Sequence, residues 1–219
     1  MEARINKDAL PRRPSASRDP ERTRAVILEA ATAEFTSKGL DGARVDEIAR
    51  RSGANKRMIY HYFGDKDGLY LAVLEAAYAA IRSEEIKLDL EHRDPIDGMR
   101  ELVQFTWNYY RDHPEFLSLL ATENLHRAAY LKRSKKIRQL HSPLVGMITN
   151  LLERGAKAKV FRKDVDPVDL YISIAALGFF YMSNRHTLST IFGRDLATPE
   201  NLKARGKHLV DVVLSYLRP

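Results

Sequence analysis

Five side chains that can donate hydrogen bonds stand close together in the first third of the sequence: Asn55, Lys56, Arg57, Tyr60 and His61. On a short helix they would all point away from the apolar side. Amide, ammonium, guanidinium, hydroxyl and imidazole groups are donors that proteins use to contact phosphate oxygens and base edges. The chemistry expected of this face is therefore the binding of nucleic acid.

Two short helices, at about 45–52 and 55–62, are expected to position these donors. Gly53 between them tolerates the left-handed conformation of a tight turn, and Ala49 is small enough to let the helices touch where they cross. The pattern predicts a helix-turn-helix, and the alternative is a plain helical hairpin with a solvated face. The residues expected to anchor the unit are Val45, Ile48, Ala54, Ile59 and Phe63.

Helices are also expected on both sides of this unit. Asp19-Pro20-Glu21 has the residue types of a helix start, and Gly39 is expected to end that helix. Gly64-Asp65 precedes a long helix that begins near Lys66 and runs into the eighties. The residues that recur at helical spacing in the first helix are Ile27, Ala30, Ala31, Glu34 and Phe35.

The remainder of the chain also has helical periodicity. Five amphipathic runs are expected, at roughly 95–112, 115–130, 141–158, 166–192 and 199–217. Each run has a proline near its start, as first turns of helices often do: Pro95, Pro114, Pro143, Pro167 and Pro199. No stretch alternates with a period of two between turn signals, so no sheet is expected. The predicted fold class is all-α.

The composition restricts the class of protein. The 219 residues are 44% hydrophobic and 30% charged, which suits a globular chain with a sizeable core. The absence of cysteine excludes disulfides, thiol catalysis and cysteine-based metal sites. The longest apolar stretch, 171–182, is too short to span a bilayer, and the N-terminus lacks the apolar region of a secretory signal. We expect a cytoplasmic protein with no membrane partner.

The formal net charge is +7, and the basic excess is densest near the N-terminus. Residues 1–64 hold 13 basic and 9 acidic residues, whereas the longer segment 65–219 holds 23 and 20. A basic surface favours polyanionic partners. The excess therefore coincides with the predicted helix-turn-helix.

Residues 23–71 resemble the N-terminal domain of the TetR/AcrR family of regulators. The resemblance implies a three-helix helix-turn-helix head, joined by a long helix to a helical ligand-binding and dimerisation body. It also implies a homodimer that binds a palindromic operator, usually as a repressor released by a small effector. We divide the chain into a flexible basic arm (1–18), a DNA-binding domain (19–65) and a ligand-binding and dimerisation domain (66–219). The matching residues are Ile27-Leu28-Glu29-Ala30-Ala31, Phe35, Gly39, Ile48-Ala49, Gly53, Ile59-Tyr60-His61-Tyr62-Phe63, Lys66 and Leu69.

By this resemblance, Lys56, Arg57 and Tyr60 fall where the recognition helix meets the major groove. Two positions depart from the family pattern. Arg44 stands where a Thr or Ser usually caps the second helix, and an arginine caps poorly but can reach a phosphate. Arg57 stands where the family often has a small residue, and it suits either guanine or a phosphate. The remaining predicted DNA contacts are Asn55 and the residues at phosphate-contacting positions, His61, Tyr62 and Lys66.

The last two predicted helices carry apolar stripes that are candidates for a dimer surface, since two helices from each subunit can form a four-helix bundle. The alternative is that these stripes belong to the core of one subunit. The candidate interface residues are Tyr171, Ala175, Phe179, Met182, Leu209, Val212, Val213 and Tyr216.

The middle helices are rich in aromatic residues and histidines, which suits a cavity with apolar walls and a few polar groups. We predict an effector site that favours a small aromatic or amphipathic molecule, and the alternative is that these residues are ordinary core or surface. Glu123-x-x-His126 is half of a di-iron helix motif without a second copy, so no metal or other cofactor is expected. The candidate effector residues are Trp107, Tyr110, His126, Phe180 and Asn184.

Other functions are less consistent with the sequence. An enzyme would be expected to show a glycine-rich phosphate loop, a nucleophile elbow or an HExxH motif, and none is present. An architectural DNA binder needs no such large body. An activator of the same fold and a helical enzyme without short motifs stay open as alternatives. The expected partners are double-stranded operator DNA, a second copy of the chain and a small effector.

Overall fold

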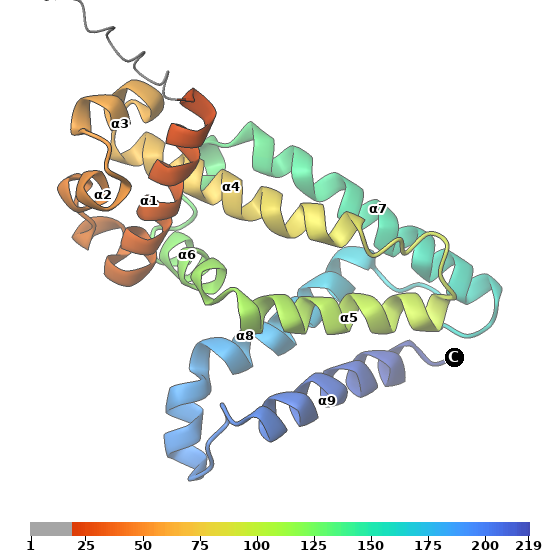
Figure 1. Cartoon of the computed structure of the whole chain (residues 1–219). Helices are drawn as coiled ribbons and strands as arrows, with labels where there is room; N and C mark the ends of the chain where they lie inside the picture. The colour runs from red at the N-terminus through yellow and green to blue at the C-terminus, as the bar shows by residue number, and fades with distance from the viewer. Residues whose placement is uncertain (1–18) are drawn as a thin grey trace, which may run out of the picture.

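The computed structural model describes residues 19–219, except for the side chains of residues 141 and 142. The predicted basic arm, residues 1–18, lies outside the described residues. Every regular element in the described part of the chain is helical, which confirms the all-α prediction (Figure 1). Within residues 19–219, no helix has the length and apolar composition needed to cross a lipid bilayer.

Three helices form the head: α1 (Pro20–Gly42), α2 (Val45–Ser52) and α3 (Lys56–Phe63). The Asp19 side chain accepts a hydrogen bond from the Glu21 amide at 3.0 Å, which caps α1 as predicted. Gly39 has φ of 68° and interrupts the helical conformation of α1. The core of the head is formed by Ile27, Ala31, Phe35, Ile48 and Ile59.

The body consists of six α-helices and one short 3₁₀ helix within the described residues. They are α4 (Lys66–Ile86), α5 (Pro95–Asp112), α6 (Pro114–Leu125), η1 (Leu131–Arg133), α7 (Lys135–Lys157), α8 (Pro167–Phe192) and α9 (Pro199–Leu217). Four of the five prolines stand at the first position of a helix, as predicted.

Two predicted boundaries are wrong. Pro143 lies inside α7 and not at its start, because Ser134 caps the helix by accepting from the Ile137 amide at 3.1 Å. The predicted helix 115–130 ends at Leu125. Arg127 and Ala128 have positive φ angles of 55° and 57°, which a right-handed helix does not allow.

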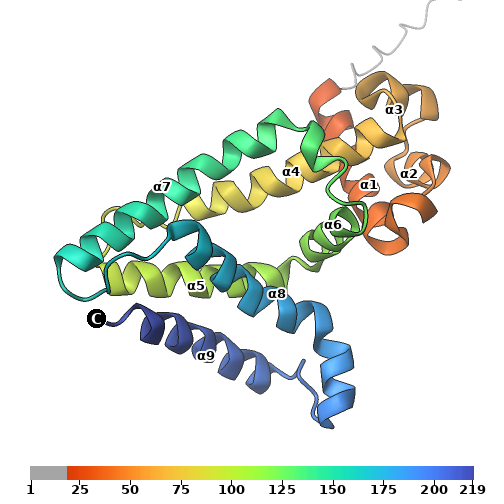
Figure 2. The ribbon, with the colours of Figure 1, turned by 180° about the vertical axis from the view of Figure 1, so that it is seen from behind.

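The body helices connect to the head at two places. Both views show α4 and α7 side by side, running from the head to the opposite end of the body, and α5 returning toward the head (Figures 1 and 2). The next helix, α6, packs against α1, and α9 packs along α5. The head is therefore held by the start of α4 and by α6.

Two glycines permit close packing around α5. Trp107 is 1% exposed, and a Cβ atom at Gly206 of α9 would lie 2.8 Å from its indole ring. A Cβ atom at Gly178 of α8 would lie 3.1 Å from the ring of Tyr110. Helices α8 and α9 therefore approach the aromatic face of α5 more closely than larger residues would permit.

Replacing Gly206 by alanine is expected to destabilise the protein by about 1–3 kcal/mol, because the added methyl group overpacks the core against Trp107. The matched control is Gly146→Ala in α7, where a Cβ atom would meet no other atom within 4 Å. That change is expected to stabilise the protein by roughly 0.5–1 kcal/mol. Urea unfolding followed by circular dichroism measures both changes, and equal midpoints for the two variants would contradict the packing argument.

Candidate nucleic-acid interface

Helix α3 separates its residues onto two faces. Ile59 is fully buried against the head, whereas Lys56, Arg57, Tyr60 and His61 are exposed. The side chain of Asn55 caps α3 by accepting from the Met58 amide at 2.8 Å. Its amide oxygen is thus used inside the protein. The predicted donors stand on a short, capped helix whose orientation is fixed by its buried side.

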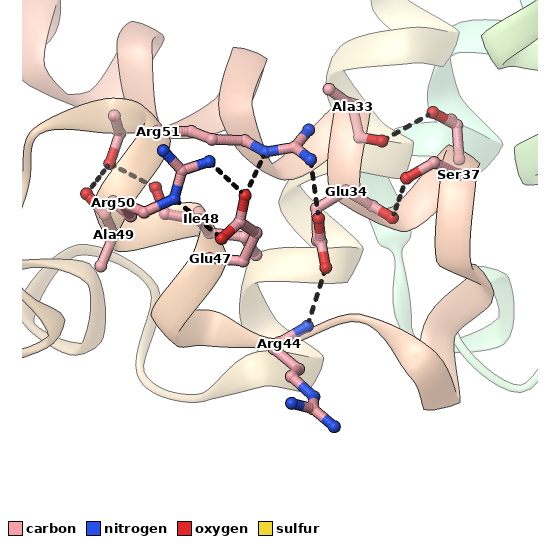
Figure 3. Close-up of polar contacts among 11 residues, drawn as sticks. Ala33, Glu34, Ser37, Arg44, Glu47, Ile48, Ala49, Arg50 and Arg51 are labelled. Atoms are coloured by element: carbon pink, nitrogen blue, oxygen red, sulfur yellow. Dashed lines mark hydrogen bonds and ion pairs between the residues drawn. The ribbon is translucent and has the colours of Figure 1, made fainter.

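A buried carboxylate of α1 fixes the start of α2 (Figure 3). Glu34 is 3% exposed, and its Oε1 accepts from the backbone amide of Arg44 at 3.3 Å. Its Oε2 lies 3.5 Å from a guanidinium nitrogen of Arg51 in α2. The Arg44 side chain makes no capping bond, so Glu34 takes over part of the anchoring that a Thr or Ser cap would provide. In the sequence, the sign of this anchoring role is that Glu34 shares the helical spacing of the apolar residues on the buried side of α1.

Glu47 in α2 joins two arginines of the same helix (Figure 3). It lies 2.6 Å from Arg50 and 2.9 Å from Arg51, and hydrogen bonds from these two guanidinium groups lower the pKa of Glu47 to about 2. Glu47 therefore stays ionised under all ordinary conditions. The guanidinium of Arg51 contacts both Glu47 and Glu34, so it is occupied by ion pairs within the head.

The predicted DNA contacts differ in how they are held. Nζ of Lys56 lies 2.6 Å from Asp46 of α2, which raises the pKa of Lys56. Nζ of Lys66 donates to the backbone oxygen of Asp41 at 3.3 Å. Arg57 makes no ion pair within residues 19–219, so its guanidinium is available to a ligand.

Tyr62, His61 and Arg44 border the exposed face of α3. Tyr62 is half-buried, and its ring packs edge-on against His61 at 5.5 Å between centroids. Arg44 is exposed at the start of α2. The structure thus brings all eight predicted DNA-contacting residues to one end of the molecule, on α3, at the N-caps of α2 and α3, and at the first residue of α4.

The five predicted effector residues do not come together. Trp107 and Tyr110 lie in the core, whereas Phe180 is 59% exposed on the opposite side of α8 from Gly178. The side chain of Asn184 donates to the Phe180 backbone oxygen at 2.9 Å on the same exposed side. His126 lies near the head, with Nε2 at 3.6 Å from Asp41. One cavity lined by all five is therefore not formed.

The predicted dimer residues differ in exposure: some are exposed or partly covered, and the others are buried. Val212 and Tyr216 are exposed, and Tyr171, Ala175 and Phe179 are partly covered. Three further residues are buried within one protomer and belong to its core, as the alternative interpretation expected, although Val213 also lines the groove between α8 and α9. They are Met182, Leu209 and Val213.

Comparisons with known proteins agree with this arrangement. Residues 27–73 match the family described as "Bacterial regulatory proteins, tetR family", and residues 95–213 match "Tetracyclin repressor-like, C-terminal domain". The chain belongs to the TetR family of bacterial transcriptional regulators. It is therefore a regulator and not an enzyme.

Several family members are similar over most of the chain. The transcriptional repressor NicS of Pseudomonas putida is 44% identical over 177 residues, which cover 81% of this chain and 84% of NicS. The repressor SCO4008 of Streptomyces coelicolor is 36% identical over 64% of this chain and 70% of its own length. A TetR-family protein from Rhodococcus shares the fold, with a TM-score of 0.69 at 16% identity over 90% of this chain and 97% of its own.

Replacing Glu34 by alanine is expected to destabilise the protein by about 1–3 kcal/mol, because the Arg44 amide loses its buried acceptor. Glu34→Gln keeps an oxygen at that position and should cost less. Glu29→Gln, on the exposed side of α1, is the control and should leave the unfolding midpoint unchanged. Thermal unfolding compares the three variants, and equal midpoints for Glu34→Ala and Glu29→Gln would refute this role.

Proposed function

We propose that this regulator is a repressor that binds a palindromic operator as a homodimer and leaves it when a small effector binds the body. The observation that carries the proposal is the exposed donor face of α3, held by a cap and a buried side. The names of the similar proteins NicS and SCO4008, both repressors, support the sign of regulation. A reporter gene behind the upstream DNA should be more active when this gene is deleted, and lower activity would indicate an activator.

In the proposed complex, α3 enters the major groove with Lys56, Arg57 and Tyr60 toward the bases. Lys56 exchanges its exposed ion pair with Asp46 for DNA, which is inexpensive because exposed pairs contribute about 0–1 kcal/mol. Asn55 retains its amide nitrogen as a donor. The proposed phosphate contacts are Arg44, His61, Tyr62 and Lys66.

The proposed dimer forms through α8 and α9. Exposed apolar residues recur four or eight positions apart on α8, at Val168, Ile172 and Phe180, and four apart on α9, at Val212 and Tyr216. An apolar groove of about 510 Å³ lies between these two helices. Two copies of this surface would bury both stripes in a four-helix bundle. Two heads would then contact half-sites about 34–36 Å apart, or a multiple of that spacing.

Arg57 and Lys66 are expected to contribute differently to operator binding. Arg57→Ala should relax preference at one base pair and cost about 1–3 kcal/mol if its guanidinium pairs with guanine. Lys66→Ala should weaken binding to all sequences and lower the salt slope by roughly one unit. Gel shifts with operator variants at several salt concentrations measure both. Uniform loss for Arg57→Ala would assign that residue to the phosphates.

Replacing Phe180 by aspartate is expected to convert the dimer into a monomer at micromolar concentration, because it places a charge in the apolar surface between subunits. Leu125→Asp is the matched control, since Leu125 is 80% exposed at the end of α6, away from α8 and α9. Sedimentation velocity measures the mass. A monomeric unmodified protein, or a dimeric Phe180→Asp variant, would contradict the proposed interface.

A further inference from the structure

A charged pair lies buried in the body near the C-terminal end of α4. Arg82 is 4% exposed and Glu85 is 1% exposed. Nη1 of Arg82 lies 2.9 Å from Oε2 of Glu85. Nη2 of Arg82 donates to the hydroxyl of Tyr171 on α8 at 3.0 Å. The pair therefore connects α4 with α8 inside the protein.

Much of the hydrogen-bonding capacity of this pair is unused. Nε and Nη1 of Arg82 and Oε2 of Glu85 are buried without a hydrogen-bond partner, because the ion contact lacks the alignment of a hydrogen bond. Taking two charges out of water costs desolvation free energy. The attraction within a buried pair offsets that cost only when the remaining donors and acceptors are also hydrogen-bonded. The pair therefore contributes little to stability, and its unused hydrogen-bonding groups are suited to binding a ligand.

The ring of Tyr171 packs against the pair, Tyr78 and Tyr110 lie within electrostatic reach of Arg82, and further rings adjoin these tyrosines. The ring of Tyr171 lies 5.6 Å from the Arg82 guanidinium carbon. The ring of Phe116 on α6 lies 5.4 Å from Tyr78 on α4 and 6.2 Å from Tyr110 on α5, measured between centroids. Rings of this kind pack favourably against a flat aromatic ligand. The surroundings therefore suit a planar molecule with one charged group.

We propose that Arg82, Glu85 and Tyr171 bind the effector and that the effector is a small aromatic carboxylate. The proposal rests on the ligand-responsive regulation proposed above. A guanidinium presents its N–H groups in a fork that matches the two oxygens of a carboxylate. The fork available in Arg82 is formed by Nε, which has no hydrogen-bond partner, and the adjacent Nη2, which carries a second hydrogen beside the one it donates to Tyr171. Glu85 then gives up its contact with Arg82 and takes a proton, so that the buried charge stays balanced.

Glu85 is able to take this proton near neutral pH. Burial raises the pKa of Glu85 to about 7, against the opposing effect of Arg82. Among the described residues, four tyrosines lie around the pair, and burial raises the pKa of each of them. They stay neutral between pH 6 and pH 8, and Arg82 stays charged. These tyrosines are Tyr78, Tyr109, Tyr110 and Tyr171.

The test is calorimetric titration of the full-length protein with benzoate and the three hydroxybenzoates, each compared with its neutral carboxamide. At least one carboxylate should bind, and its amide should bind about tenfold more weakly or not at all. Because binding adds a proton to Glu85, affinity should be about tenfold lower at pH 8 than at pH 6. Binding of no carboxylate at millimolar concentration, or equal binding of acid and amide, would overturn the proposal.

Two variants separate a ligand site from a structural pair. Arg82→Met combined with Glu85→Leu removes both charges, which is often neutral or stabilising for a buried pair. This double variant should keep its unfolding midpoint and operator binding and lose the carboxylate. Glu85→Gln should keep the ligand and lose the pH dependence. Unchanged carboxylate affinity in the double variant would refute the site. If the unmodified protein does not bind operator DNA, the proposed function is refuted instead.

Discussion

The position of the recognition helix depends on one buried carboxylate, Glu34. It lies on the packed side of α1, and it holds the backbone of Arg44 and the guanidinium of Arg51 at the two ends of α2. Helix α2 is only two turns long and would be unstable alone. Its contact with α1 therefore determines where Gly53 turns the chain, and through that turn where α3 presents its donors. The DNA-binding face is a consequence of packing beneath it.

The helices of the head were predictable because their boundaries are encoded by local chemistry. Asp19, Asn55 and Asp65 cap helices with their own side chains, and Gly39 and Gly53 adopt positive φ angles where helices break. The same logic failed in the middle of the chain. The start of α7 was expected near Pro143, but Ser134 caps the helix nine residues earlier, and Pro143 is accommodated inside the helix at a local cost.

The exposed face of α3 was predictable for a related reason, and the positions of the body residues were not. A short helix such as α3 has one apolar side, so its exposed side is determined. Helix α8 is apolar on most of its circumference, and its sequence does not determine which stripe faces α5. The structure shows that Gly178 faces Tyr110, which turns Phe180 outward. The burial of Arg82 and its missing hydrogen-bond partners could not be predicted from the sequence, because they depend on how distant helices pack.

The two connections between body and head place the charged pair where it can influence DNA binding. Arg82 and Glu85 lie on α4, the helix that begins at Lys66 beside the recognition helix. Tyr78 of α4 packs against Phe116 on α6, the helix that ends at His126 against Asp41 of the head. A ligand releases DNA only to the extent that it binds the DNA-free arrangement more tightly, and about 100-fold release requires roughly 2.7 kcal/mol. One carboxylate paired with a buried guanidinium supplies interactions of that size, and its site lies on α4, one of the two helices that hold the head.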